Sequence, residues 1–224
     1  MNKSSLIERY LNRKSDAEKI VEYALNNDFK FNSLQKEIVN CYERKNNKIL
    51  FCGYRRSGVT FGLAMSMIAN AFLNANTKIY YMSTAKMSMS RDLLRRNVLY
   101  LVKEGFITRH TAERIEFFNG SSIQLMMNSP NSMRGVSADY IYVDTVNEGR
   151  GRTFLAETER AISLCVANRN GKIIVGYTTE EINMQEDAFI SSAMHSYDTV
   201  LFDCDEEKER HICMMERSGR IAAL

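Results

Sequence analysis

The sequence lacks the features that mark disordered, secreted or membrane-spanning chains. Its 224 residues include one proline and eleven glycines, which argues against disorder, a collagen-like chain or a long flexible linker. The longest apolar stretches, such as residues 140–143 and 173–175, are far too short to cross a bilayer. The first residues lack the apolar core of a signal peptide. We therefore expect no membrane partner and a cytoplasmic location.

Metal-binding residue types are also sparse. The five cysteines are an odd number without a CxxC pair, and the three histidines do not cluster. This distribution argues against a zinc site and is typical of free thiols in a reducing compartment. The net charge of +3 permits contact with nucleic acid but does not require it.

What is present is an alternation of helical and strand patterns. Residues 1–45 have helical periodicity, and we expect them to form a helical amino-terminal segment. From residue 46 to residue 224, short apolar strands alternate with helices, which predicts one α/β domain with a mainly parallel sheet covered on both faces. The expected helices are 17–25, 33–44, 61–73, 90–104, 153–167 and 188–195. The expected strands are 48–52, 78–82, 139–143, 172–176 and 199–202, with a hairpin of 114–118 and 121–126. At its tip, Asn119-Gly120 predicts a type I′ turn, in which both residues have positive φ.

The loop after the first strand fits the spacing of a phosphate-binding loop at all positions but one. That motif has glycine, four residues, glycine, lysine, and then serine or threonine. Gly53, Gly58 and Thr60 are in place, whereas Val59 stands where lysine belongs. A strand precedes the loop and a helix follows, so backbone amides at the helix start can hold phosphate oxygens. The Thr60 hydroxyl is a candidate ligand of Mg²⁺.

The missing lysine leaves two interpretations of this loop. Its ammonium would contact the β- and γ-phosphates, where charge develops during transfer. Arg55 or Arg56 is a candidate to supply that charge from the other side of the loop. In the alternative interpretation, the segment is an ordinary strand–turn–helix corner that happens to contain two glycines.

A second acidic candidate closes the apolar strand 140–143. In P-loop ATPases an aspartate at the end of such a strand helps to hold Mg²⁺, which makes Asp144 the candidate here. Many of these enzymes carry a glutamate directly afterwards, but this position is Thr145 and the nearest glutamate is Glu148. We expect Asp144 and the glycine loop to lie side by side at the carboxyl edge of one parallel sheet. The alternative is a core strand that ends in a solvated aspartate.

Several segments occur in an order that resembles the ATPase domain of phage terminase large subunits. The similarity extends over about residues 29–179. Residues 31–35 resemble the adenine-side segment, with Gln35 as the base contact, and residues 55–60 resemble the terminase P-loop. Residues 115–123 and 132–139 resemble the hairpin and the Arg-Gly stretch before Walker B, and residues 140–144 resemble Walker B itself. Residues 176–179 resemble the coupling motif, whose threonine senses the γ-phosphate and is matched here by Thr178.

The resemblance implies an additional-strand, catalytic-glutamate type of P-loop fold that binds ATP and Mg²⁺. It implies translocation of double-stranded DNA into a procapsid by a homo-oligomeric ring, with the portal and other motor subunits as partners, in the cytoplasm of an infected host cell. The implied catalytic residues are Arg55, Asp144 and Glu148, and the implied metal ligands are Thr60 and Asp144. The implied nucleotide-binding residues are Gln35, Gly53, Arg55, Arg56, Ser57, Gly58, Thr60 and Thr178.

Three departures from the family pattern set up two hypotheses of function. Val59 replaces the lysine, Thr145 replaces the glutamate, and about 45 residues after Thr179 are too few for the usual nuclease domain. Loss of one charge-stabilising group typically lowers a rate about 100- to 1,000-fold. The chain is therefore either a weakly active packaging ATPase or a catalytically inactive P-loop pseudo-ATPase with a structural or regulatory role. A P-loop helicase fits less well, because the length leaves no room for a second RecA-type domain.

Overall fold

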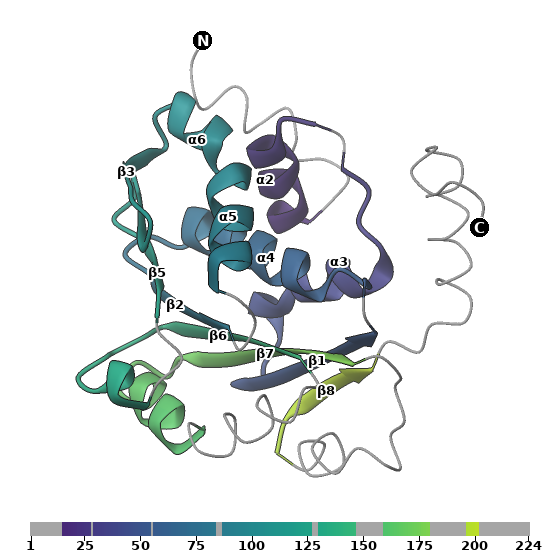
Figure 1. Ribbon diagram of the computed structural model, residues 1–224, viewed down its shortest axis with the longest axis vertical. Helices are drawn as coiled ribbons and strands as arrows, with labels where there is room; N and C mark the ends of the chain where they lie inside the picture. Colours follow the sequence, from purple (N-terminus) through teal and green to yellow (C-terminus); the bar gives the residue numbers. More distant parts are fainter. Residues whose placement is uncertain are drawn as a thin grey trace.

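The centre of the molecule is one sheet, described by a computed structural model of residues 15–27, 29–54, 56–83, 87–126, 130–146, 159–179 and 196–201. Within these residues the sheet has eight strands in the order β3-β4-β5-β2-β6-β7-β1-β8 (Figure 1). The strands are β1 (Lys48–Tyr54), β2 (Lys78–Ser83), β3 (Ile107–His110), β4 (Arg114–Phe117), β5 (Ser122–Leu125), β6 (Tyr140–Val146), β7 (Lys172–Thr179) and β8 (Asp198–Leu201).

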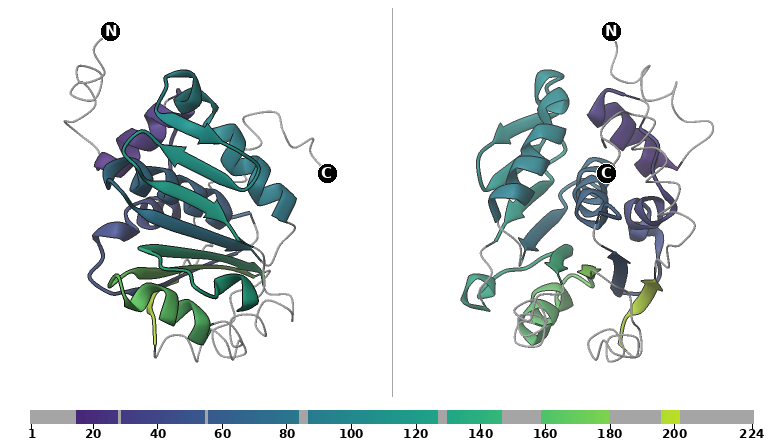
Figure 2. Two further views of the ribbon diagram at one scale, coloured as in Figure 1. Left: turned by 90° about the vertical axis from the view of Figure 1, so that its left-hand side faces the viewer. Right: turned by 45° about the vertical axis from the view of Figure 1, so that its right-hand side comes forward.

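The sheet is mainly parallel, as the sequence predicts. The six strands from β5 to β8 in this order pair in parallel, and β3 and β4 extend the sheet antiparallel beyond β5. Figure 2 shows this extension from two further sides. The hairpin of β4 and β5 is thus confirmed, whereas β3 was not expected, because its four residues form an edge with a single buried side chain.

Helices cover both faces of the sheet (Figure 1). On one face lie α2 (Asp16–Leu25), α3 (Ser33–Val39), α4 (Val59–Leu73), α5 (Met87–Asn97) and α6 (Leu99–Lys103). A helical stretch over residues 159–167 covers the other face. No helix in the described part of the chain is long and apolar enough to span a membrane.

Helix α4 is the centre of the larger core. It follows β1 directly, and its side chains are mostly buried because α2, α3 and the sheet surround it. Small residues allow this close approach: a Cβ added at Gly62 would stand 3.0 Å from the Ile38 Cδ1 atom of α3. The apolar residues of α2 and α3 belong to the same core as α4 and the strands.

Several helix boundaries differ from the sequence prediction. The expected helix 33–44 ends at Val39 and continues as a short 3₁₀ turn, Cys41–Glu43. The expected helix 90–104 is divided into α5 and α6, which meet at the buried Val98. Helix α4 begins at Val59 rather than at residue 61. The expected helix 188–195 lies outside the described residues.

The predicted type I′ turn at residues 119–120 is wrong. Only Gly120 has a positive φ, of 82°. The Gly120 N–H donates to the Phe117 carbonyl (3.0 Å) and the Phe117 N–H donates to the Ser121 carbonyl (2.8 Å), which defines a three-residue loop. The reason is tertiary, because the Asn119 amide donates to the carbonyls of Ala71 and Phe72 at the end of α4 (2.9 and 3.0 Å). Asn119 thereby satisfies carbonyls that a helix end leaves free.

Candidate nucleotide-binding site

The two sequence motifs meet at the carboxyl edge of the sheet, as expected. Strands β1 and β6 are both parallel to β7, which lies between them. In the register of these pairs, Gly53 lies opposite Thr178 and Asp144 lies opposite Gly176. The glycine loop, Thr178 and the carboxylate therefore lie at similar heights on three adjacent strands.

The glycine loop makes a tight turn between β1 and α4. The Ser57 N–H donates to the Tyr54 carbonyl (3.0 Å), and the Gly62 N–H donates to the carbonyl of Gly58, the N-cap residue of α4 (2.8 Å). Gly58 has a φ of 84° and Arg56 has a φ of 75°. An arginine in the left-handed region is uncommon and costs on the order of 1 kcal/mol, which is typical of loops shaped for binding. The Arg56 side chain is exposed, and Arg55 lies outside the described residues.

Two glycines let the start of α4 lie directly on the sheet. A Cβ added at Gly53 would stand 2.4 Å from Ser57 Oγ and 2.8 Å from Val59 Cγ2. A Cβ added at Gly176 would stand 2.6 Å from Val59 Cγ1. Val59 is only 2% exposed, so the residue that replaces the lysine fills the space above β1 and β7. Position 59 is a packing position in this protein.

The predicted adenine-side segment, residues 31–35, is hydrogen-bonded to the same loop. The Asn32 amide donates to the Ser57 carbonyl (2.9 Å), while its Oδ1 accepts from the Gln35 N–H (2.8 Å). The Gln35 Oε1 accepts from the Asn32 N–H (3.1 Å), which completes a capping box at the start of α3. The Gln35 amide nitrogen lies over Gly58, where an added Cβ would stand 2.2 Å away. Residues at the start of α3 thus contact the glycine loop and hold it in place.

Asp144 is a buried carboxylate with one satisfied oxygen. The side chain is 2% exposed, and its Oδ2 accepts a hydrogen bond from the Tyr81 hydroxyl (2.9 Å). The Oδ1 atom has no regular hydrogen-bond partner among the described residues. Burial raises the pKa of Asp144 above its ordinary value, although the hydroxyls of Thr60 and Tyr81 act in the opposite direction. The Thr60 hydroxyl therefore faces this carboxylate, an arrangement in which both residues could contact one ion.

These residues fit a nucleotide-bound Mg²⁺. Hard cations prefer oxygen ligands, and Mg²⁺ is usually held by one or two protein groups together with phosphates. The hydroxyl of Thr60 and the free oxygen of Asp144 are such groups. Ser57 Oγ is a second buried oxygen atom without a partner in the described part of the chain. No cluster of three or more metal-binding His, Cys, Asp or Glu side chains occurs among the described residues, so phosphate oxygens would have to complete the ligand set.

The position of the catalytic glutamate is not open to a nucleotide. Thr145, which follows the aspartate, is fully buried. Successive side chains of a strand point to opposite faces, so Thr145 points away from the face that carries Asp144. Glu148 lies outside the described residues. The half-buried Thr178 is placed by its pairing with Gly53 at the level of the loop.

Two further residues of the site were not singled out from the sequence. Asn32 could have been, because asparagine followed three residues later by glutamine is the pattern of a capping box. Tyr81 carries no local signal, since it is one of two adjacent tyrosines in an apolar strand. Its role depends on β2 and β6 being neighbours.

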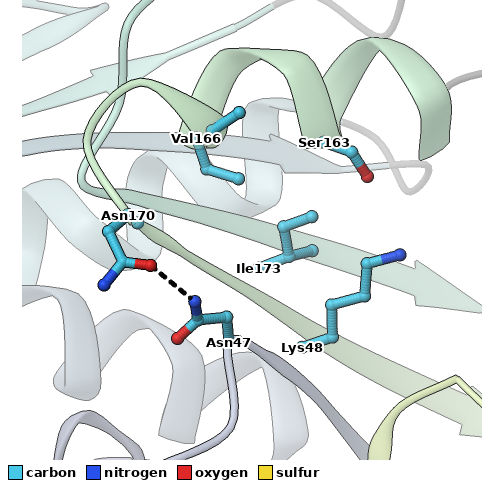
Figure 3. A pocket seen from close by; sticks show the side chains of 8 residues that line it. Asn47, Lys48, Ser163, Val166, Asn170 and Ile173 are labelled. Atoms are coloured by element: carbon cyan, nitrogen blue, oxygen red, sulfur yellow. Dashed lines mark hydrogen bonds between the residues drawn. The ribbon is translucent and has the colours of Figure 1, made fainter.

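A small cavity of about 150 Å³ lies at the opposite edge of the sheet (Figure 3). It is lined by Asn47, Lys48, Ser163, Val166, Ala167, Asn170, Gly171 and Ile173. Asn47 and Asn170 hydrogen bond to each other (3.0 Å), and the Lys48 ammonium pairs with Glu159 (2.9 Å). Because β1 and β7 begin here, the cavity is separate from the glycine loop.

Neither a protein-family profile nor a curated protein matches this sequence. Solved structures do match. The ATPase domain of the Thermus phage P74-26 large terminase aligns with a TM-score of 0.58 at 13% identity, over 89% of this chain and 91% of that one. The HK97 bacteriophage large terminase aligns with a TM-score of 0.62 at 12% identity, over 99% and 52%. The large terminase of a thermophilic bacteriophage, in complex with ATP-γ-S, aligns with a TM-score of 0.53 at 12% identity, over 87% and 50%.

These matches define both the fold class and the particular fold. The chain has a P-loop-like α/β fold, with a sheet flanked by helices. More particularly, its fold is that of the ATPase domains of phage large terminases, which confirms the structural side of the sequence resemblance. The chain spans about half the length of the HK97 large terminase and of the terminase in complex with ATP-γ-S. At 12–13% identity the likeness is one of fold.

Proposed function

We propose that this chain is the ATPase domain of a terminase-type DNA-packaging motor, and that it binds ATP with Mg²⁺ at the loop between β1 and α4. The observation that carries the proposal is that the Thr60 hydroxyl and the buried Asp144 carboxylate face each other beside the start of α4, while the Asp144 Oδ1 atom has no regular hydrogen-bond partner among the described residues. Helix starts favour phosphate, and a buried carboxylate is costly unless it is paired or binds a metal.

Each part of the site has a defined task in this proposal. The backbone amides at the start of α4 would bind phosphate oxygens, and Thr60 and Asp144 would hold the ion. When bound, Mg²⁺ neutralises charge on the β- and γ-phosphate oxygens. Arg56, which is exposed on the loop, is available to place a positive charge there instead of the missing lysine. Thr178 is available to detect the state of the γ-phosphate.

The wider role is also a proposal. Double-stranded DNA would be the substrate of translocation, and the portal and further copies of the chain in a ring would be its partners. The site of action would be the cytoplasm of an infected host cell. The terminase fold over 89% of the chain supports this role.

A second candidate function is that of a pseudo-ATPase that binds nucleotide without turnover. A specific observation favours it: Val59 and Thr145, at the lysine and glutamate positions, are both buried in packing. Such a protein would keep the pocket and act as a structural or regulatory partner of a motor.

Titration with a fluorescent ATP analogue, with Mg²⁺ and with EDTA, tests the binding site. We expect Thr60→Ala to weaken Mg²⁺-dependent binding by about 10-fold or more, because metal-site partners typically contribute that much. Thr108→Ala is the matched control, since Thr108 is exposed on β3 at the far edge of the sheet. Absence of Mg²⁺-dependent binding in the wild-type protein would contradict the proposal.

ATP turnover, measured with and without linear double-stranded DNA, separates the two candidate functions. A motor with an arginine in place of lysine should hydrolyse ATP faster when DNA is present. Its turnover should fall in Arg56→Ala or Arg55→Ala but not in the control Arg96→Ala. Arg96 is exposed on α5 and serves as a control for loss of one surface charge. Binding without turnover supports the pseudo-ATPase.

A further inference from the structure

We infer that Tyr81 is a positioning residue, which fixes the Asp144 carboxylate so that its Oδ1 atom is presented to the nucleotide-bound Mg²⁺. The inference rests on the proposed nucleotide site and adds a residue from β2, a strand that carries neither sequence motif. Tyr81 would act through Asp144 and would not itself contact the ion.

The geometry comes from the pairing of β2 with β6. These strands are parallel neighbours, with Tyr81 opposite Tyr142 and Ser83 opposite Asp144. The tyrosine ring is long enough to reach from its own position to the carboxylate two residues further along, where its hydroxyl donates to Oδ2 (2.9 Å). Tyr81 is 1% exposed and Asp144 is 2% exposed, so water cannot readily replace this bond.

The hydrogen bond from Tyr81 makes the two carboxylate oxygens of Asp144 unequal. A free carboxylate can rotate and offer either oxygen, or both together, to a cation. With Oδ2 bonded to Tyr81, rotation is restricted and Oδ1, which has no regular partner among the described residues, remains for the ion or its water. Partners that orient a metal ligand in this way typically change metal affinity about 10- to 100-fold.

A purely structural role for Tyr81 is the alternative, because buried hydroxyls generally need a partner. Tyr142 provides the matched control within the same core. It is fully buried on β6, two residues before Asp144, and its hydroxyl contacts Ser66 (2.9 Å) and Asn70. Tyr142→Phe removes a buried hydroxyl of the same kind without removing the bond to the carboxylate.

The test compares nucleotide affinity in Mg²⁺ with affinity in EDTA, for the wild-type chain, Tyr81→Phe and Tyr142→Phe, using a fluorescent ATP analogue. Thermal unfolding of each variant without nucleotide shows that it is folded. We expect Tyr81→Phe to bind the nucleotide about 10- to 100-fold more weakly than wild type when Mg²⁺ is present. Its affinity in EDTA should stay near the wild-type value. Tyr142→Phe should keep both values, even if it unfolds at a lower temperature.

The outcomes separate this inference from the proposed function. If wild-type protein shows no Mg²⁺-dependent nucleotide binding, the proposed function fails and the role of Tyr81 fails with it. If wild-type protein binds but Tyr81→Phe keeps the full gain from Mg²⁺, only the role of Tyr81 is overturned. Equal losses in both tyrosine variants would assign the effect to general core packing and would also overturn it. If Tyr81→Phe does not fold, Tyr81→Met takes its place, because methionine adapts to irregular space in a core. A folded Tyr81→Met protein that keeps the full gain from Mg²⁺ would overturn the role of Tyr81.

Discussion

The two edges of the parallel sheet differ in how fully their charged and polar groups are hydrogen-bonded. At the amino edge, Arg169 forms two hydrogen bonds to Asp139 (3.0 Å each), and the Lys78 N–H donates to the same carboxylate (2.7 Å). The Lys172 ammonium there donates to the Tyr42 carbonyl (2.7 Å). At the carboxyl edge, the buried Asp144 and Ser57 each keep an oxygen without a regular partner among the described residues.

This difference agrees with the binding site that we propose at the carboxyl edge and with a structural role for the amino edge. Buried polar atoms are nearly always hydrogen-bonded in folded proteins, so exceptions need an explanation. Two such exceptions, on Asp144 and Ser57, lie beside the left-handed loop at the carboxyl edge, where a bound ligand would supply the missing partners. The amino-edge groups named above, including Asn47 and Asn170 at the small cavity, all have hydrogen-bond partners.

The same substitution at the two edges should have opposite effects, and this is the largest difference we expect. Asp144→Asn should abolish the Mg²⁺-dependent part of nucleotide binding yet raise the free energy of unfolding at neutral pH. Burial raises the pKa of Asp144, so the folded state holds its proton more tightly than the unfolded state, and stability falls as pH rises from about 3.8 through the raised value. The advantage of Asp144→Asn should therefore disappear in acid, below about pH 4.

Asp139→Asn is the matched change at the amino edge. It weakens the paired bonds to Arg169, and we expect the free energy of unfolding to fall by about 1 kcal/mol at neutral pH. Urea denaturation of both variants over a range of pH measures the two effects. Destabilisation of both variants at neutral pH would contradict the contrast between the edges.

Restoring the motif lysine at position 59 should lower the stability of the fold rather than raise the rate of ATP hydrolysis. Val59→Lys places an ammonium and a longer chain in a space that is closed by Gly53, Gly176 and Leu63. We expect a loss of more than about 2 kcal/mol in the free energy of unfolding, from overpacking and burial of a charge. Val59→Ala, which only empties the space, should cost about 2 kcal/mol. A Val59→Lys protein that is as stable as wild type and hydrolyses ATP faster would show that position 59 opens to the nucleotide.

Gly58 and Gly135 have similar positive φ angles, so substitutions at the two positions distinguish backbone strain from contacts made by the loop. Gly58 and Gly135 have φ values of 84° and 76°, but a Cβ would clash with Gln35 only at Gly58 and would meet nothing within 4 Å at Gly135. Gly135→Ala should cost about 1 kcal/mol from backbone strain alone. Gly58→Ala should cost more and should weaken nucleotide binding, measured by denaturation and titration. Equal costs, with binding unchanged, would mean that Gln35 moves aside freely.

The smallest expected effect concerns the attachment of α3 to the loop. Asn32→Ala removes the side-chain cap of α3 and the bond to the Ser57 carbonyl, and should cost about 1 kcal/mol. Ser15→Ala removes a comparable cap from α2, at a distance from the loop. Both variants should lower the unfolding temperature, but only Asn32→Ala should weaken binding of the fluorescent ATP analogue. A similar affinity in the two variants would contradict support of the loop by α3.

Local patterns in the sequence predict much of the fold. Strands β1 and β2, the β4–β5 hairpin and the meeting of the glycine loop with Asp144 follow from short apolar runs, turn residues and motif spacing. The turn at Gly120 could not be predicted, because Asn119 is held by carbonyls of a helix 47 and 48 residues away in sequence. The roles of Tyr81 and Val59 were equally hidden, since each depends on strands that only the folded sheet brings together.

The space shared by Gly53, Gly176 and Val59 has a consequence for how such proteins diverge. A larger residue at either glycine would need a smaller one at position 59, or a helix set further from the sheet. Related sequences that regain a lysine at position 59 should therefore differ from this chain at the other two positions as well, so that the three change together as one unit.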